Sequence, residues 1–546
     1  MRTDNVERNV AKDAKQPNIL IFCTDEQCAD HLSCMGHPHV KTPHIDRIAA
    51  EGTLFRNGYS SGPICMPARA TMMTGLGNRQ HGVVDNGIDL DKRLPTLPGL
   101  LADAGYRTHS IGKLHLAGRG GREIAEDEDF SIHPERRIYW DWPGHWKGAC
   151  YKRFPDNYFG FQTVELAQGH VHYIYGDYVT WLEEHHPGVY TKGYKNNNED
   201  PHPLAIDPEL HYNTWIADRS IAFIREQAAG GGMQGKAAGG ESAPRSRPFF
   251  LWCSFPDPHE PFAAVKKWSD FYDDMAIELP PNTLALSPDS RSETMTKLGL
   301  GTKPIDPGRV RKSIQQTYGM VSHVDEQVGR ILDALDEQGI ADNTVILFIS
   351  DHGDQLGEHG LFYKGIYPYD RHAHIPFLVK VPDAAEKGKV VDDVVSMLDM
   401  VPTVLDLAGA PYPNPGRVAG APPCATPPGE VLTPVVSGTA RPVRKRALVE
   451  LDRGMIGSDP VKMRALVTND YKIVHYPLQG ETMLFDRKKD PMELRNVAND
   501  PDCRDVLTDM LKALLTEIAR TESIGERMRI SSMRDAMASA QASCPR

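Results

Sequence analysis

Short apolar runs recur along the chain, and two of them end in residues that carry charge. Residues 18–24 read NILIFCT and residues 345–350 read VILFIS. Continuous apolar runs of this length are typical of strands buried on both faces, as in parallel sheets. The residues that follow the two runs at once are Asp25, Glu26, Asp351 and His352. Two further runs predict strands of the same kind, at residues 249–255 and 375–380.

Segments with helical periodicity separate these runs. They cover residues 44–51, 96–104, 212–228, 314–337 and 397–407. The fourth carries an apolar stripe at helical spacing, formed by Val324, Val328, Ile331, Leu332 and Leu335. Alternating strands and helices predict an α/β sheet with helices on both faces. Because sites in such sheets collect beyond the carboxyl ends of the strands, both acidic pairs are expected at one crevice.

Composition shifts predict the domain organisation. We expect an N-terminal extension at 1–16, a catalytic domain at 17–410 with a mobile Gly/Ala/Ser-rich insertion at 227–248, and a Pro/Gly-rich linker at 411–429. A smaller subdomain follows at 430–522, with strand-like runs at 447–451, 465–476 and 481–486 and a helix at 505–520. The remaining tail, 523–546, is a candidate oligomer arm. No internal repeats are found.

The chain totals exclude several classes of protein. With 546 residues and a net charge of −12, the chain lacks the basic balance that nucleic-acid binding needs. No apolar run approaches a membrane span, and the first residues lack the apolar region of a secretory signal. Nine scattered cysteines do not describe a disulfide framework. We therefore expect a cytoplasmic protein that binds neither nucleic acid nor membrane.

The two acidic strand ends supply three carboxylates and one imidazole. Hard divalent cations prefer carboxylate oxygens, and a histidine among the ligands shifts the preference toward Mn²⁺. The alternative is that acidic residues after strands only cap the helices that follow.

Cys65 occupies a position that needs a chemical explanation. It lies between Pro63 and Pro67, just before residues 68–73, which favour a helix, and Arg69 follows within one turn. A helix N-terminus and an arginine fork both suit an anion. Three interpretations are open: a buried structural thiol, a thiolate nucleophile with a lowered pKa, or a cysteine that is converted to another group.

The residues around Cys65 resemble a known family. The sequence Cys65-Met-Pro-Ala-Arg69, followed by Thr74-Gly75, matches the C-x-P-x-R signature of the type I sulfatases in the alkaline phosphatase superfamily. Further blocks appear in family order between Pro17 and Asn499: PNILIFCTDEQ, KTPHIDRIAAEGTLFRNGY, GYRTHSIGKLHL, FPDPHEPF, SDHGDQLGEHGLFYKG and LFDRKKDPMELRNVA. The resemblance implies a large mixed sheet sandwiched by helices, with a smaller C-terminal antiparallel sheet plus helix.

The resemblance also implies how the site works. Cys65 would be oxidised to Cα-formylglycine by a formylglycine-generating enzyme that binds the chain transiently. In the hydrated aldehyde, one oxygen attacks sulfur and expels the alcohol. The second hydroxyl then loses its proton, so that the carbonyl re-forms and sulfate is eliminated.

The remaining roles are implied position by position. One divalent cation would be held by Asp25, Glu26, Asp351, His352 and the formylglycine at position 65. Arg69 would steady the diol, while Lys113 and His115 would bind sulfate and assist deprotonation of the diol. His259 and Lys364 would bind sulfate oxygens, and one of them would protonate the leaving oxygen. Asn86 is either a substrate-binding residue or part of an Asn-Gly turn.

Departures from the family pattern bear on the metal and the substrate. Glu26 and His352 stand where many members have aspartate and asparagine, which leaves Ca²⁺ and Mn²⁺ both open, and Ala68 replaces the usual serine. The Lys113/His115 pair favours a sulfatase, so the expected function is arylsulfatase-like hydrolysis of a small-molecule sulfate monoester. The alternatives are a phosphonate monoester hydrolase or phosphodiesterase with the same site, and a non-catalytic anion-binding protein with an unmodified thiol. The aromatic residues at 138–146 are candidates for the pocket lining, and we expect a homo-oligomer.

Overall fold

The computed structural model places two sheets within one chain. It describes residues 16–116, 157–195, 200–230, 247–283, 289, 291–302, 304–412, 427–440, 445–453 and 460–522. One sheet has nine strands and the other has four. Within this described part, none of the helices combines the length and the apolar character that a membrane-spanning helix requires. The six cysteines it contains are all free.

The large sheet is mixed. Its strands are β1 (Asn18–Thr24), β2 (Thr53–Tyr59), β3 (Arg107–Gly112), β4 (Thr163–Leu166), β5 (Phe249–Ser254), β6 (Thr344–Ser350), β7 (His374–Ile375), β8 (Phe377–Lys380) and β9 (Lys389–Ser396). Their order is β4-β3-β5-β1-β6-β8-β2-β7, and β9 pairs with β2. The five strands from β4 to β6 run parallel, whereas β8 is antiparallel to β6.

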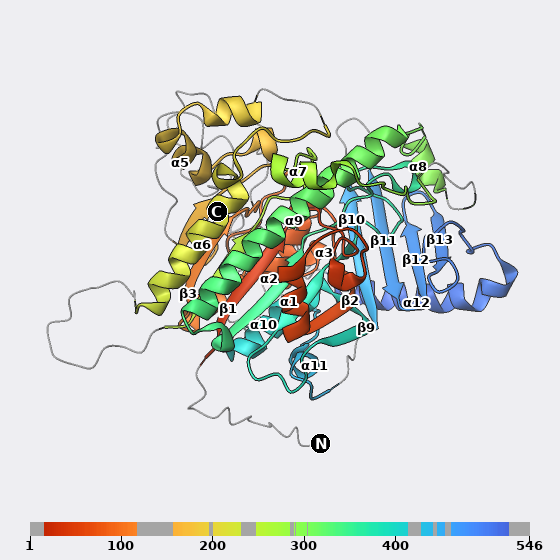
Figure 1. Cartoon of the computed structure of the whole chain (residues 1–546). Helices are drawn as coiled ribbons and strands as arrows, with labels where there is room; N and C mark the ends of the chain where they lie inside the picture. The colour runs from red at the N-terminus through yellow and green to blue at the C-terminus, as the bar shows by residue number, and fades with distance from the viewer. Residues whose placement is uncertain are drawn as a thin grey trace, which may run out of the picture.

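Helices cover both faces of this sheet, as the sequence predicts (Figure 1). Alternate residues of β1 belong to two separate cores: Ile19 and Ile21 to one, Leu20 and Phe22 to the other. The first core is closed by α2 (Cys65–Thr74), α4 (Leu97–Asp103) and α10 (Met400–Ala408). The second is closed by α1 (Pro43–Glu51), α6 (Tyr212–Ala228) and α9 (Pro307–Glu337).

The C-terminal sheet is antiparallel in the order β10-β11-β12-β13. Its strands are β10 (Arg446–Arg453), β11 (Val461–Thr468), β12 (Tyr471–Tyr476) and β13 (Glu481–Asp486). One face packs on α12 (Arg504–Arg520), through Met510 and Leu514. The other face shares a core with residues of the large unit, among them Tyr59, Ile64, Ile366 and Tyr369.

Several predicted bounds need correction. The helix predicted at 314–337 begins at Pro307, because the Asp306 carboxylate caps it by accepting from Gly308 N and Arg309 N. The run at 375–380 is two strands, since proline at 376 cannot donate to the ladder. The run at 465–476 folds back on itself as β11 and β12. Residues 397–399 form a 3₁₀ turn before α10, and α2 begins at Cys65 itself.

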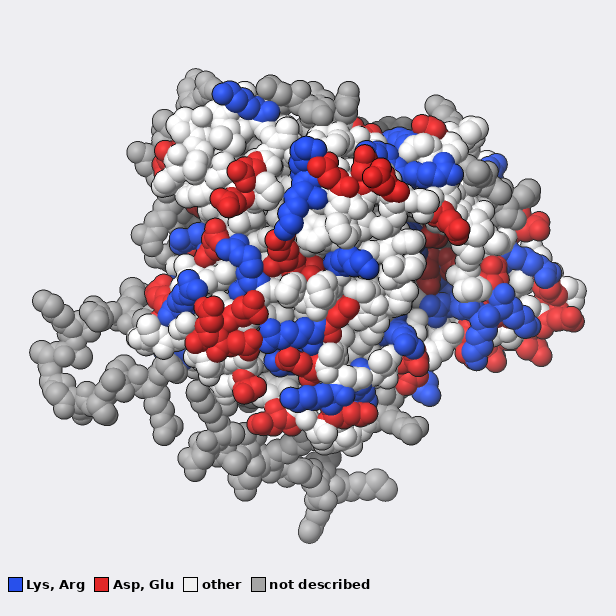
Figure 2. All heavy atoms as spheres, viewed as in Figure 1, with Lys and Arg blue, Asp and Glu red and all other residues white. Residues whose placement is uncertain are grey.

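Other predictions lie largely or wholly outside the described residues. These are the N-terminal extension, the tail at 523–546, the aromatic residues at 138–146, and most of the linker and of the insertion at 227–248, whose first two residues end α6. The short helix α11 (Thr433–Val436) packs with α10 in the first core. The division into domains therefore stays a prediction. Figure 2 shows acidic and basic side chains interspersed over the described part of the face that carries α9.

Candidate active site

Four neighbouring parallel strands end at one edge of the large sheet, and each delivers a predicted site residue. In the register, Thr24 of β1 pairs with Ser350 of β6, and Gly112 of β3 pairs with Ser254 of β5. The residues that follow these strand ends include Asp25, Asp351, Lys113 and His259. Predicted site residues that are more than 300 positions apart therefore meet at one place, as expected for the carboxyl edge of a parallel sheet.

Gly112 makes the close approach of β3 and β5 possible. Its φ is 97°, and a Cβ atom there would lie 1.9 Å from the carbonyl oxygen of Ser254. Only glycine fits this position, and the chain then turns so that the buried Lys113 reaches the strand ends.

Cys65 is the first residue of α2 and is 2% exposed. Its Sγ lies 3.2 Å from Nε2 of His352 and 3.9 Å from Oδ1 of Asp25. Burial and the charge of Asp25 act to raise the thiol pKa, but Lys364, Lys113 and His352 outweigh them and hold it well below its ordinary value. The position therefore favours a group that is anionic or polar over an inert buried thiol.

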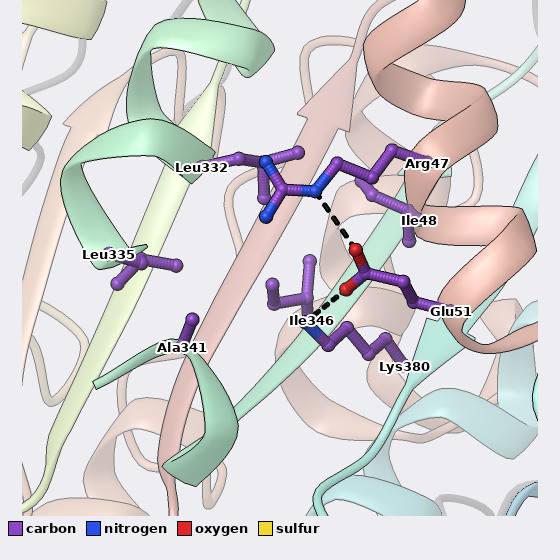
Figure 3. Close-up of a pocket in the computed structure, with 8 residues that line it drawn as sticks. All are labelled: Arg47, Ile48, Glu51, Leu332, Leu335, Ala341, Ile346 and Lys380. Carbon is purple, nitrogen blue, oxygen red and sulfur yellow. Dashed lines mark hydrogen bonds and ion pairs between the residues drawn. The ribbon is translucent and has the colours of Figure 1, made fainter. Parts of the chain in front are cut away.

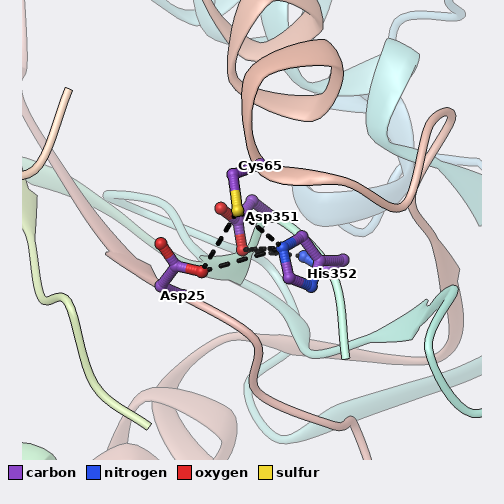
Figure 4. A group of neighbouring side chains, drawn as sticks. All are labelled: Asp25, Cys65, Asp351 and His352. Atoms are coloured by element: carbon purple, nitrogen blue, oxygen red, sulfur yellow. Dashed lines mark hydrogen bonds and ion pairs between the residues drawn. The ribbon is translucent and has the colours of Figure 1, made fainter. Parts of the chain in front are cut away.

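A cluster of ligand atoms from Asp25, Cys65, Asp351 and His352 is arranged to hold a cation (Figure 4). These atoms all lie within 4.8 Å of one another, and all four residues are buried. Nδ1 of His352 lies 3.0 Å from the carbonyl oxygen of Gly353, to which it donates. The proton is then on Nδ1, so the Nε2 lone pair is free to face the cluster, as metal-binding histidines require. The residues present fit a divalent cation.

Arg69 is fully buried and ties the site together. Its guanidinium donates to Asp351 Oδ2 at 2.8 Å, to Asp25 Oδ2 at 3.3 Å, and to Ser254 Oγ and the Lys113 carbonyl at 3.1 Å each. The planar fork thus fixes both carboxylates of the cluster and two strand ends at once. The role that the family resemblance implies for Arg69, to steady the diol at position 65, stays a prediction.

Cations surround Asp25 on its other side. Lys113 Nζ donates to Asp25 Oδ2 and lies 2.5 Å from Nε2 of His170. Burial would raise the pKa of Asp25, but Lys113, His259 and Arg69 hold it well below its usual range. His170 is a residue that the sequence reasoning missed. Its ring stacks on that of His259, with centroids 3.4 Å apart and planes 4° from parallel.

His259, Glu260, Lys364 and Glu26 form an adjoining group. His259 Nδ1 lies 2.7 Å from Glu260 Oε2, and Lys364 Nζ lies 2.6 Å from Glu26 Oε2 while also contacting His259 Nε2. Burial lowers the pKa of His259, but the charge of Glu260 outweighs it and raises the pKa to about 9. Burial also opposes the charge of Lys364, whose pKa Glu26 and Glu260 nevertheless raise well above its ordinary value.

Glu26 does not lie with the four-residue cluster. Its backbone is in the left-handed region, with a φ of 67°, and its N–H donates to Asp351 Oδ1 at 3.1 Å. The side chain turns toward Lys364 and His259, and Oε1 is buried with no hydrogen-bond partner in the described part of the chain. Its role as a metal ligand stays a prediction.

His115 and Asn86 flank Cys65. His115 is in contact with the Cys65 side chain, and burial lowers its pKa. Asn86 is exposed, and its Oδ1 accepts a hydrogen bond from the N–H of Met66 at 3.0 Å. In this arrangement Asn86 holds the first turn of α2, next to Cys65, so a structural contact is added to the two roles that the sequence left open.

A second buried group, His211, Asp257 and His323, has the composition of a metal site but a different chemistry. The N–H of Asn213 donates to Nδ1 of His211 at 3.1 Å. This bond uses the Nδ1 lone pair, so the proton is on Nε2, which then has no lone pair for a metal. The carboxylate of Asp257 accepts from Tyr212 and Asn213. The group is therefore a hydrogen-bonded structural cluster next to the end of β5, not a metal site.

A shallow hollow lies near the opposite end of the sheet (Figure 3). It is lined by Arg47, Ile48, Glu51, Leu332, Leu335, Ala341, Ile346 and Lys380. Glu51 accepts from Arg47 at 3.0 Å and from Lys380 at 2.5 Å, so both cations at the hollow are paired. Ile346 precedes Asp351 by five positions, or about 16 Å along a strand. The hollow is therefore remote from the strand-end site.

Comparisons with known proteins agree with this geometry. The sulfatase family model matches residues 17–133 and 235–410, and a model of the C-terminal part of N-sulphoglucosamine sulphohydrolase matches 357–520. The chain is 27% identical to an arylsulfatase of Clostridium perfringens, over 93% of this chain and 95% of that protein. It is also 27% identical to a choline-sulfatase of Rhizobium meliloti, over 89% of this chain and 83% of that protein.

A solved structure supports the fold. The phosphonate monoester hydrolase of Agrobacterium radiobacter superposes with a TM-score of 0.71 at 23% identity, over 92% of this chain and 96% of that one. The sulfatase model alone covers more than half of the chain. The protein is thus an enzyme of the sulfatase family, within the alkaline phosphatase superfamily.

Proposed function

We propose that this protein hydrolyses a sulfate monoester and releases inorganic sulfate, with formylglycine at position 65. The observation that carries the proposal is the convergence of four cationic side chains on Cys65 and the ligand cluster. Arg69 and Lys113 contact carboxylates of the cluster, and Lys364 and His259 contact the adjoining Glu26 and act on the Cys65 side chain. A compact anion such as sulfate is held by a concentration of positive charge in a dry site, which also stabilises charge that develops in the transition state.

The modified residue would supply the nucleophile. A hydrated aldehyde at position 65 offers one oxygen to attack sulfur and a second hydroxyl whose deprotonation breaks the adduct. The position suits this role because it opens a helix, where the N–H groups and the helix dipole favour negative charge. The contact between His115 and the Cys65 side chain supports the proposal that this imidazole takes the proton of that second hydroxyl.

A divalent cation would be held by Asp25, Asp351, His352 and the modified residue 65, with Glu26 as a further candidate ligand. When bound, it would polarise the sulfate oxygens and lower the pKa of the nucleophile. Mn²⁺ is the ion that we propose, since His352 presents an imidazole nitrogen to the cluster.

Departure of the alcohol requires a proton donor. Lys364 and His259 are in contact, and both pKa values are raised, so the pair retains a proton to donate near neutral pH. The nearby Glu260 holds His259 through Nδ1, which aims Nε2 at the Lys364 ammonium and the reacting centre. We propose that one of the two donates to the leaving oxygen while the other binds sulfate.

A phosphonate monoesterase is the second candidate, because a solved enzyme of that activity shares the fold. The two activities differ in the charge and shape of the group that is held. The Lys113/His115 pair supports the sulfatase, because the family resemblance links that pair to sulfatases.

Side-by-side assays decide between the two. We expect kcat/KM for 4-nitrophenyl sulfate to exceed that for 4-nitrophenyl phenylphosphonate, with Cys65→Ala as the inactive control. A sulfate ester that is the poorer substrate by orders of magnitude would contradict the sulfatase proposal. The proposal also includes conversion of Cys65 by a formylglycine-generating enzyme, a cytoplasmic location and a homo-oligomeric state. Each of these needs a separate test.

A further inference from the structure

The segment that carries Lys364 is held on its two sides by different parts of the chain. Before Lys364, the loop is fixed by hydrogen bonds between its own residues. Gln355 N donates to Tyr363 O at 3.0 Å, and Tyr363 N donates to Asp354 Oδ1 at 3.0 Å. After Lys364, residues 366–370 turn toward the C-terminal sheet and contact it through hydrogen bonds, ion pairs and rings.

Tyr476, the last residue of β12, makes the contact nearest to Lys364. Its side chain is fully buried, and its hydroxyl donates to the carbonyl of Ile366 at 3.0 Å. Ile366 is two positions after Lys364, with Gly365 between them. A hydrogen bond to a buried backbone carbonyl fixes the chain at that point, because an unpaired carbonyl would be costly.

Asp370 is fixed by charges from β12 and from the segment that follows β13. Its carboxylate accepts from Lys472 Nζ at 3.0 Å, and its N–H donates to Glu493 Oε2 at 2.7 Å. Lys472 is 2% exposed and Glu493 is 3% exposed, and the two pair with one another. A buried, fully paired network of this kind has one favourable geometry, so it specifies where the loop lies.

The apolar contacts agree with the polar ones. Ile366, Tyr367 and Tyr369 belong to the same buried core as Tyr476 and Phe485 of the C-terminal sheet. Tyr369 also stacks on His359, with centroids 3.5 Å apart. The loop between β6 and β7 is therefore packed against the C-terminal sheet as closely as a core element.

We propose that the C-terminal sheet is a positioning element for Lys364, acting through Tyr476 and the Asp370–Lys472–Glu493 network. The inference rests on the proposed function in assigning Lys364 to the reacting group. In this account, the sheet touches no substrate; it holds the Ile366 carbonyl and the Asp370 backbone, and through them the ammonium. A shift of about 1 Å in such a group can reduce the rate on the order of 100-fold.

A double-mutant cycle tests this link. Tyr476→Phe removes only the hydroxyl that holds Ile366, and Lys364→Ala removes the ammonium that it positions. We expect Tyr476→Phe to lower kcat/KM for 4-nitrophenyl sulfate about tenfold in the parent protein and to have no further effect in the Lys364→Ala background. Such non-additivity is the signature of residues that act as one unit.

Tyr178→Phe is the matched control. Tyr178 is equally buried, and its hydroxyl donates to the Leu210 carbonyl at 2.8 Å, in a different core from the one that Ile366 and Tyr476 share. We expect it to change kcat/KM by less than about twofold in either background. Formylglycine content and unfolding midpoint are measured for every variant, so that a loss of modification or of folding is recognised as such.

Two results would overturn the proposal: an equal loss from Tyr476→Phe in both backgrounds, or no loss in the parent protein. Glu493→Gln offers a second route, because it keeps the acceptor for Asp370 N–H but removes the charge that pairs with Lys472; its loss should likewise vanish when Lys364 is absent. If the sulfate ester is the poorer substrate of the parent protein by orders of magnitude in kcat/KM, the sulfatase proposal fails. The cycle is then run on the phosphonate ester, and the positioning proposal is judged by the same coupling.

Discussion

Sγ of Cys65 lies 3.2 Å from Nε2 of His352, although the two residues are 287 positions apart in the chain. The contact joins the first turn of α2 to the carboxyl end of β6, so a group formed at position 65 adjoins the cluster of candidate metal ligands. Since the Gly353 carbonyl holds the proton on Nδ1, His352 presents a lone pair at this place. The candidate nucleophile and the candidate metal site are therefore one centre.

The identity of residue 352 should set the metal preference. His352→Asn replaces an imidazole nitrogen by an amide oxygen, a harder ligand. We expect the parent protein to bind Mn²⁺ more tightly than Ca²⁺, and the variant to lose about 10- to 100-fold in Mn²⁺ affinity with little change for Ca²⁺. Isothermal titration of metal-stripped protein measures both; a variant that loses Ca²⁺ and Mn²⁺ affinity equally would argue against this assignment.

Arg69 should not be replaceable by lysine. The guanidinium makes four hydrogen bonds in a fully buried place, and a lysine ammonium has only three donors and no planar fork. We expect Arg69→Lys to lower kcat about 100-fold or more and to weaken metal binding, because Asp25 and Asp351 lose their fixed positions. Near-parental kcat with intact metal binding would show that a point charge suffices.

We expect His170 to contribute to activity through stacking of its ring on His259. It stacks on His259 at a centroid distance of 3.4 Å, and stacked rings contribute about 0.5–1.5 kcal/mol. His170→Ala is expected to lower kcat/KM by up to about tenfold, whereas His170→Phe, which retains a ring, should stay within about threefold. If the phenylalanine variant loses as much as the alanine variant, the nitrogen that contacts Lys113 is the important feature instead.

Asp325 should make the stability of the fold depend on pH. Its carboxylate accepts from the N–H groups of His44 and Ile45 at the start of α1, but burial outweighs these bonds and raises its pKa to about 7. A carboxyl whose pKa is raised on folding stabilises the fold below its unfolded pKa of about 4, and this contribution is lost as pH rises toward 7.

The variant Asp325→Asn cannot ionise and should lose this dependence. Relative to the parent protein, its free energy of unfolding should rise by about 2–3 kcal/mol between pH 5 and pH 8. Urea unfolding of both proteins at each pH measures the difference. A constant difference across that range would show that Asp325 stays ionised throughout.

The sequence predicts the framework of the site well because that framework depends on strand ends. The runs at 18–24 and 345–350 are apolar apart from Asn18, Thr24 and Ser350, so their burial and the meeting of Asp25 with Asp351 follow from the sheet topology. The helix at 212–228 and the strand at 481–486 are confirmed with the predicted bounds.

Other features depend on tertiary context that no local pattern displays. β3 has the sequence RTHSIG, whose polar residues do not indicate a buried strand. The strand is buried because it pairs with its neighbours β4 and β5. His170 lies outside the regular elements, and its contact with His259 spans 89 positions. The positive φ of Glu26 turns its side chain from the cluster toward Lys364, which sequence spacing does not reveal.

Mass spectrometry of the peptide that contains residue 65 tests the central claim most directly. The protein is produced together with a formylglycine-generating enzyme. The peptide mass and the sulfate-releasing activity are then measured on the same preparation. The account predicts a peptide that has lost the sulfur atom and two hydrogens and gained an oxygen, in proportion to the sulfate-releasing activity. Full activity in protein whose residue 65 is still an intact cysteine would contradict it.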